Sequence, residues 1–195
     1  MAFKVPTKIS ATTTTSSGGG YLNPSRVPSG GQVRFHLTAE EPLAFFECWG
    51  EAEDGSVKPF RFADDPSPED IKAEMGPNYS RRLNREGTAP EPVKAALAFS
   101  VYNYETEQVQ ICQLTQKGLI SELDSITQME DYQPIDNFDF VLSKEGSGLT
   151  TQYTLRPVPA KKGGHDAAVK AQEAADAAGF DVNRLLVGGN PFKAD

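Results

Sequence analysis

Aromatic side chains stand beside basic or polar ones in three short stretches of this sequence: Arg34-Phe35, Phe60-Arg61-Phe62 and Tyr102-Asn103-Tyr104. Any base of a single-stranded nucleic acid can stack on an aromatic ring, at about 1 to 3 kcal/mol per base, while arginine and lysine contact the phosphates. The chemistry that these residue types indicate is therefore noncovalent binding of a single strand rather than the making or breaking of bonds.

Nine side chains are candidates for that contact. Tyr102 and Tyr104 share one face of a predicted strand, where they would either stack on bases or pack under a helix. Trp49 fits the core or the rim of a barrel as well as a stacking role. The nine candidates are Arg34, Trp49, Lys58, Arg61, Arg81, Arg82, Arg85, Tyr102 and Tyr104.

The three arginines of residues 78–86 belong to a stretch that prolines interrupt repeatedly, and they form either a solvated loop or a clamp on a bound strand. Most phenylalanines, in contrast, are expected in the core. Those with this expectation are Phe35, Phe45, Phe60, Phe62, Phe99, Phe138 and Phe140.

Catalytic motifs are missing from the sequence. It has no phosphate-binding glycine loop, nucleophile elbow, His-Glu-x-x-His motif or paired cysteine ligands, and Cys48 and Cys112 are too far apart in sequence to indicate a zinc site. His36 and His165 have no matching nucleophile or metal-ligand spacing, so we expect both to face solvent without a catalytic role. The prediction is a protein that is not an enzyme and uses no metal or cofactor.

Hydrophobic periodicity predicts the elements that position these residues. Period-two alternation and turn signals indicate strands, and apolar residues at three- and four-residue spacing indicate a helix over residues 116–130 with Thr115 as its N-cap. The strands are expected at residues 32–37, 43–49, 56–62, 96–104, 109–114, 137–142 and 150–156.

The order of these elements favours a mainly β protein built on a five-stranded OB-like barrel, with one helix between the third and fourth strands. An SH3-like barrel and a small sandwich remain open. Residues 1–20 are expected to be a flexible arm, residues 21–160 the domain and residues 63–95 a long loop insertion within it. Residues 161–195 are predicted to form a linker, an alanine-rich helix over 166–178 ended by Gly179, and a tail.

Charge and hydropathy limit the class of protein. The formal net charge is −8, which at first opposes a polyanionic ligand, but much of the acid lies between Glu105 and Asp139 while the candidate bases lie earlier in the chain. A dipolar protein of this kind can bind phosphate on one face. The sequence contains neither a membrane-length apolar run nor a signal-peptide segment, so we expect a cytoplasmic protein without membrane contact.

Three motifs resemble a family of tailed-phage single-stranded DNA-binding proteins with an OB-fold. The first is VYNYETEQVQICQLTQK at residues 101–117, and the others are YLNP at residues 21–24 and EGSGLTTQYTLRP at residues 145–157. The resemblance implies a protein that coats single-stranded DNA during phage replication, recombination and repair. It adds Lys117, at the start of the predicted helix, as a phosphate contact.

The sequence also departs from that family. It has no cysteine-rich zinc insertion and no strongly acidic tail, although its Pro191-Phe192 end is loosely similar to the tips with which bacterial single-strand binders recruit replication or recombination proteins. The function expected is sequence-tolerant single-stranded DNA binding, in a host-cell cytoplasm if the chain is phage-encoded. The alternatives are a β-rich virion or assembly protein that makes protein contacts, and a nuclease on a barrel scaffold.

Overall fold

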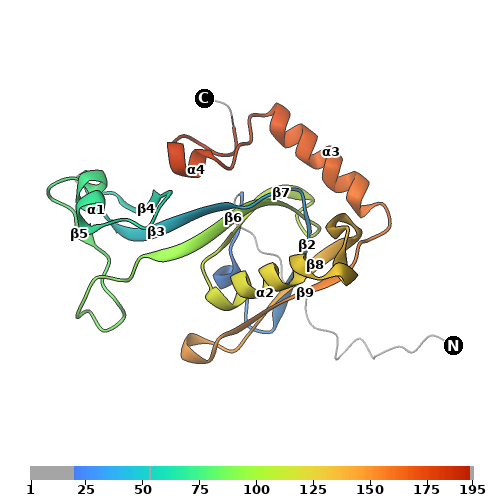
Figure 1. The fold of residues 1–195 in the computed structure, drawn as a ribbon, viewed down its shortest axis with the longest axis horizontal. Helices are drawn as coiled ribbons and strands as arrows, with labels where there is room; N and C mark the ends of the chain where they lie inside the picture. Colours follow the sequence, from blue (N-terminus) through green and yellow to red (C-terminus); the bar gives the residue numbers. More distant parts are fainter. Residues whose placement is uncertain (1–19, 53, 194–195) are drawn as a thin grey trace.

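The computed structural model describes residues 20–52 and 54–193, so the predicted arm lies outside the described residues except for Gly20. The fold is mainly β, as predicted, and its strands form one mixed sheet (Figure 1). The strands are β1 (Tyr21–Leu22), β2 (Gly31–Leu37), β3 (Leu43–Glu51), β4 (Val57–Phe62), β5 (Ser80–Arg81), β6 (Lys94–Asn103), β7 (Gln108–Leu114), β8 (Phe138–Glu145) and β9 (Gln152–Pro159). The helices are α1 (Pro68–Met75), α2 (Lys117–Gln128), α3 (Gly164–Ala177) and α4 (Arg184–Val187).

The main path of the sheet runs in the order β1-β7-β6-β2-β8-β9. Strand β2 pairs antiparallel with both β6 and β8, and the pairs β6–β7 and β8–β9 are antiparallel neighbours in sequence. Strand β3 also pairs with the first half of β6. Helix α2 lies on one side of this sheet and α3 and α4 lie on the other (Figure 1).

The alternation of side chains along the strands produces two different faces. In β2, Val33 and Phe35 are buried in the main core, where Phe35 stacks on Phe140 of β8 at 5.8 Å between ring centroids. The intervening Arg34 and His36 point to the opposite side. We call the side of the sheet that carries Arg34 and His36 the outer face, and the side that packs on α2 the inner face.

The closed five-stranded barrel of the sequence prediction is not what the pairing shows. The described residues contain nine strands, and their path does not close, because the outer edge of β7 pairs with the short parallel strand β1 rather than with β9. The extra strands come from residues 21–22 and from the β3–β4–β5 region. The placement of one helix between the hairpin β6–β7 and the strand β8 is confirmed.

The sequence indicated a long loop over residues 63–95, but the structure has a helix and a short strand there. Ser67 caps α1 through a capping box with Asp70. Pro68 lies in the first turn, where a backbone N–H has no helical partner, so proline loses no hydrogen bond there. Ile71 and Met75 of this helix pack on the β3–β4 hairpin. Together with β5, these elements form an extension that projects from the body of the sheet, which we call the β3–β5 extension (Figure 1).

Two helix boundaries were predicted with different success. Thr115 is not the N-cap of α2, since the helix begins one residue later and its cap, Gln116, makes no side-chain cap bond. The alanine-rich helix is confirmed as α3, and the chain leaves it through Gly179, whose φ of 90° is left-handed and suits glycine. Within the described residues, no helix combines the length and the apolar character needed to cross a membrane.

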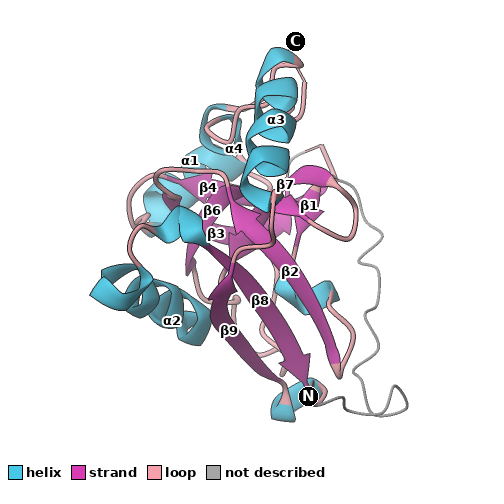
Figure 2. Cartoon of the chain, turned by 90° about the vertical axis from the view of Figure 1, so that its right-hand side faces the viewer, coloured by secondary structure: helices cyan, strands magenta, loops and turns pink. Residues whose placement is uncertain are grey.

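The free edge of β9 is protected against pairing with another strand. Helix α2 lies along β9 (Figure 2), and its Glu122 accepts a hydrogen bond from the backbone N–H of Leu155 at 2.8 Å. The next two backbone nitrogens that face outward on this edge belong to Pro157 and Pro159. Proline has no N–H, so neither residue can donate to an added strand.

We expect Glu122→Ala to lower the free energy of unfolding by about 1 to 2 kcal/mol, because it removes the partner of a partly buried N–H. Urea unfolding measures this change. Asp124→Ala is the matched control, since it removes an exposed carboxylate from the same helix. Equal losses in the two variants would show that the Glu122 contact adds nothing specific.

Candidate functional site

The outer face brings together five of the ten residues that the sequence singled out. Register and alternation place Arg34 of β2, Trp49 of β3, Arg61 of β4 and Tyr102 of β6 on this face, and Tyr104 follows β6 directly. Tyr102 and Tyr104 meet edge to face, with their ring centroids 5.2 Å apart. These five aromatic and basic residues therefore share one face of the sheet.

A buried carboxylate, Glu47, organises one end of the outer face. The Nε1–H of Trp49 donates to its Oε1 at 2.9 Å, and Arg61 and Gln113 donate to its Oε2 at 3.1 and 2.9 Å. Gln113 belongs to β7, so this contact crosses over β6, whose residue on that side is the small Ala96. The arrangement fixes the Trp49 ring and the Arg61 guanidinium in place.

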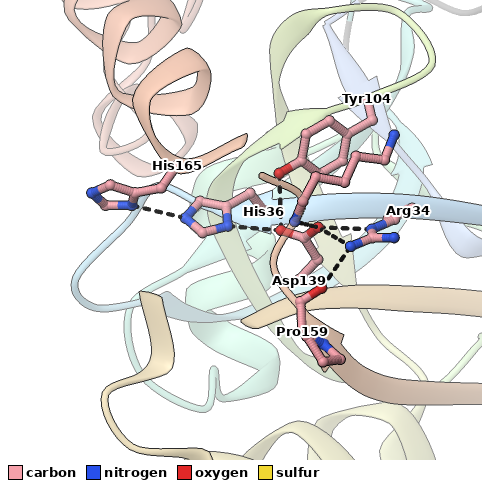
Figure 3. A network of polar contacts seen from close by, with 7 residues as sticks. Arg34, His36, Tyr104, Asp139, Pro159 and His165 are labelled. Carbon is pink, nitrogen blue, oxygen red and sulfur yellow. Dashed lines mark hydrogen bonds and ion pairs between the residues drawn. The ribbon is translucent and has the colours of Figure 1, made fainter. Parts of the chain in front are cut away.

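A second buried carboxylate, Asp139, organises the other end (Figure 3). Arg34 Nε donates to its Oδ2 at 2.7 Å, Arg34 Nη2 forms an ion pair with the same oxygen at 2.6 Å, and the backbone N–H of Lys161 donates to it at 3.1 Å. Oδ1 accepts from the Tyr104 hydroxyl and the His36 Nδ1, each at 2.9 Å. Four hydrogen bonds and the ion pair thus converge on one side chain that has no exposed surface.

The donors decide the protonation state of this carboxyl. Burial alone would raise the pKa of Asp139, but the hydrogen bonds from His36, Arg34, Tyr104 and the Lys161 backbone outweigh burial and hold the pKa below its usual value. Burial, and next the hydrogen bond to Asp139, raise the pKa of Tyr104, so that its hydroxyl keeps its proton. Asp139 is therefore ionised and Tyr104 neutral at neutral pH.

This shift predicts a specific loss of stability in acid. Because the folded pKa of Asp139 lies below the unfolded value of about 3.9, its contribution is complete above about pH 4 and is lost as the pH falls through the folded pKa. We expect the difference in unfolding free energy between the wild type and Asp139→Asn to shrink below pH 4, measured by urea unfolding. A difference that stays constant from pH 6 to pH 3 would contradict the assignment.

His36 does not face solvent, contrary to the prediction, since it is 1% exposed between Asp139 and His165. Its Nδ1 must carry a proton to donate to the ionised Asp139. Its Nε2 lies 3.3 Å from Nδ1 of His165, the second residue of α3, so one ring donates this hydrogen bond and the other accepts it (Figure 3). A cavity of about 490 Å³ borders both histidines and is lined further by Glu40, Asp136 and Glu173.

The C-terminal segment, residues 164–193, lies on the outer face. Leu185 of α4 is buried against Phe45 and Ile111, and Phe180 and Phe192 pack beside it. The Phe192 ring meets Tyr21 edge to face at 5.0 Å. The predicted recruiting tip at the C-terminus is therefore folded back on the sheet in this structure.

The same segment explains the burial of the tyrosine pair. Tyr102 is only 8% exposed, so of the two roles that the sequence left open for it, packing under a helix is the one observed. Tyr104 carries the Lys161 ammonium over its ring, 4.3 Å from the centroid. Neither tyrosine is an open stacking platform while the C-terminal segment is in place.

The other five predicted residues lie elsewhere. Lys58 points to the opposite side of β4, where its ammonium lies over Phe60. In the β3–β5 extension, Arg81 donates to the Glu91 backbone and Arg82 pairs with the Glu91 carboxylate at 3.6 Å. Those not brought to the outer face are thus Lys58, Arg81, Arg82, Arg85 and the α2 residue Lys117.

The described residues contain no group of three or more histidine, cysteine or carboxylate side chains placed to hold a metal ion. Comparison with known proteins finds no matching family model, curated protein or solved structure. The geometry of the chain itself therefore carries the functional argument.

Sequence reasoning missed the residues that hold the outer face together: Glu47, Gln113, Asp139 and the two histidines. One signal was available, because Asp139 stands between Phe138 and Phe140, and a carboxylate inside a buried strand needs partners. Those partners come from β2, from Tyr104 just after β6 and from Lys161 before α3, which are far apart in the sequence.

Proposed function

We propose that this protein binds single-stranded DNA without strong sequence preference, through the outer face of its sheet. The observation that carries the proposal is the convergence on that face of Arg34, Trp49, Arg61, Tyr102 and Tyr104. Three aromatic rings and two guanidinium groups on one face are the combination that binds bases and phosphates of a single strand.

The pairing of the strands supports the same proposal. Strands β2, β6, β7, β8 and β9, with α2 between β7 and β8, follow the order and most of the neighbour relations of an OB-fold. OB-folds bind oligonucleotides on the face of their second and third strands. In this chain those strands correspond to β6 and β7, which form the middle of the outer face, and we propose that the unit is an OB-like fold left open beside β7.

Arg34 and Lys161 offer charge for the phosphates despite the acidic total. Arg34 uses Nε and Nη2 for Asp139 and Pro159, and within the described residues no partner is assigned to its Nη1. Its side chain is 31% exposed. Lys161 lies next to it over the Tyr104 ring, so a phosphate can meet two cations beside an aromatic surface.

Titration of the full chain with a labelled oligothymidine tests the proposal, by fluorescence anisotropy at increasing salt. We expect the logarithm of the association constant to fall linearly with the logarithm of the salt concentration. Strands of other base composition should bind with similar affinity. Absence of binding, or binding that salt does not change, would overturn the proposal. Cofractionation with particles without retention on single-stranded DNA cellulose would instead support an assembly protein.

A further inference from the structure

The C-terminal segment covers a surface whose composition differs from that of a protein core. Beneath α3 and α4 lie apolar residues such as Ile111 and Ala98, but also His36, Tyr102 and Tyr104. The inner face of the same sheet, in contrast, is mostly aliphatic and phenylalanine side chains, and its buried polar pair, Asn103 and Gln110, is satisfied by a mutual hydrogen bond at 2.8 Å. A covered face with this many polar and aromatic groups is suited to a ligand that replaces the cover.

Helix α3 contributes few buried side chains to the cover, whose apolar contacts with the sheet come from Leu185, Phe180 and Phe192. Of the fourteen residues of α3, the buried ones are Gly164 and Ala168, and α4 buries Leu185. Glycine and alanine bury little apolar area, so α3 contributes little to its own docking. Segments with few buried apolar contacts open at a low free-energy cost relative to the core.

The polar contacts at this interface also favour opening. The hydrogen bond between His36 and His165 joins α3 to the sheet, and either ring can exchange it for water. Gln172 of α3 has its Oε1 buried without a hydrogen-bond partner among the described atoms, which opposes docking. In the sheet, the carboxylates of Asp139 and Glu47 keep all the hydrogen bonds described above when the segment leaves, because their donors come from the strands, from Tyr104 and from Lys161.

The chain leading into the cover is built to let it move as a unit. Lys161, Lys162 and Gly163 are exposed, and Gly163 has a left-handed φ of 71° at the start of α3. The segment also holds itself together, since Arg184 donates to the Asn190 carbonyl at 3.0 Å and the Asp181 N–H donates to the Pro191 carbonyl at 2.9 Å. It can therefore leave the sheet without losing these internal contacts.

We propose that residues 164–193 are a displaceable cover that competes with single-stranded DNA for the outer face, so that the chain as described is the closed state. This inference rests on the proposed function. A ligand that binds only the open state has an apparent dissociation constant raised by the inverse of the open fraction. Weakening the cover must therefore tighten DNA binding, and DNA must release the cover.

The test compares oligothymidine affinity for the full-length wild type and for the double variant Leu185→Ala/Phe192→Ala. Both substitutions remove apolar contacts between the cover and the sheet. Val187→Ala is the matched control, because Val187 lies in the same short helix and is 81% exposed. We expect on the order of 10-fold tighter binding for the double variant and no change for the control.

A second measurement uses the wild type alone, so that it does not depend on how the variant folds. Lys170 is an exposed lysine of α3 within the cover, and we expect oligothymidine to accelerate tryptic cleavage after it, because opening removes the contacts that hold α3 on the sheet. If the wild type binds oligothymidine, the double variant binds it no more tightly, and cleavage does not change, the proposed cover is wrong and the DNA-binding proposal stands. No binding by either protein would overturn both proposals.

Discussion

Replacing Asp139 with asparagine is expected to lower the free energy of unfolding by about 3 kcal/mol or more, because breaking a buried ion pair leaves the partner charge uncompensated. An amide cannot balance the charge of Arg34. Its NH₂ group would also face donors from Arg34, His36 or Tyr104, whichever way it is turned. Urea unfolding at neutral pH measures the loss.

Asp136→Asn is the control for that experiment. Asp136 lies three residues earlier, is exposed, and loses the same charge on substitution. We expect its unfolding free energy to stay within about 0.5 kcal/mol of the wild type, as for most surface substitutions. An Asp139→Asn protein as stable as this control would show that the Asp139 network does not support the fold.

Replacing Trp49 with alanine is expected to weaken oligothymidine binding by on the order of 10-fold, because one stacked base contributes about 1 to 3 kcal/mol. The surrounding face should persist, since Arg61 and Gln113 still donate to Glu47 when the indole is gone. Fluorescence anisotropy with a labelled strand measures the change.

Trp49→Phe separates stacking from the hydrogen bond. It keeps an aromatic ring but loses the Nε1–H that donates to Glu47. If stacking is the role of Trp49, the phenylalanine variant should retain most of the affinity. Affinity that is equal in the wild type and in Trp49→Ala would remove Trp49 from the DNA site.

Local patterns predicted the parts of this fold that local physics determines. The alternation of Val33 and Phe35 with Arg34 and His36 identified a strand with one buried face, and the spacing of Leu119, Leu123 and Ile126 identified α2. Helix α1 escaped prediction because it has only eight residues between prolines, and its stability comes from the Ser67 cap and from packing of Ile71 and Met75 on the hairpin.

The candidate site was predictable as residue types but not as an arrangement. The sequence singled out Arg34 and Tyr104 separately, but the carboxylate that both contact, Asp139, is 105 residues from Arg34 and 35 residues from Tyr104. The docking of residues 164–193 on the sheet depends on apolar contacts such as Leu185 with Phe45. No periodicity within either segment indicates such a contact.

The proposed DNA site is the outer face of the sheet. Photocrosslinking tests it most directly, with an oligonucleotide that carries 5-iodouracil and with the crosslinked residues mapped by mass spectrometry. We expect crosslinks to Trp49, Tyr102 and Tyr104. Crosslinks confined to Tyr132 and Tyr153, which line the groove between α2 and β9 on the inner side, would contradict DNA binding on the outer face.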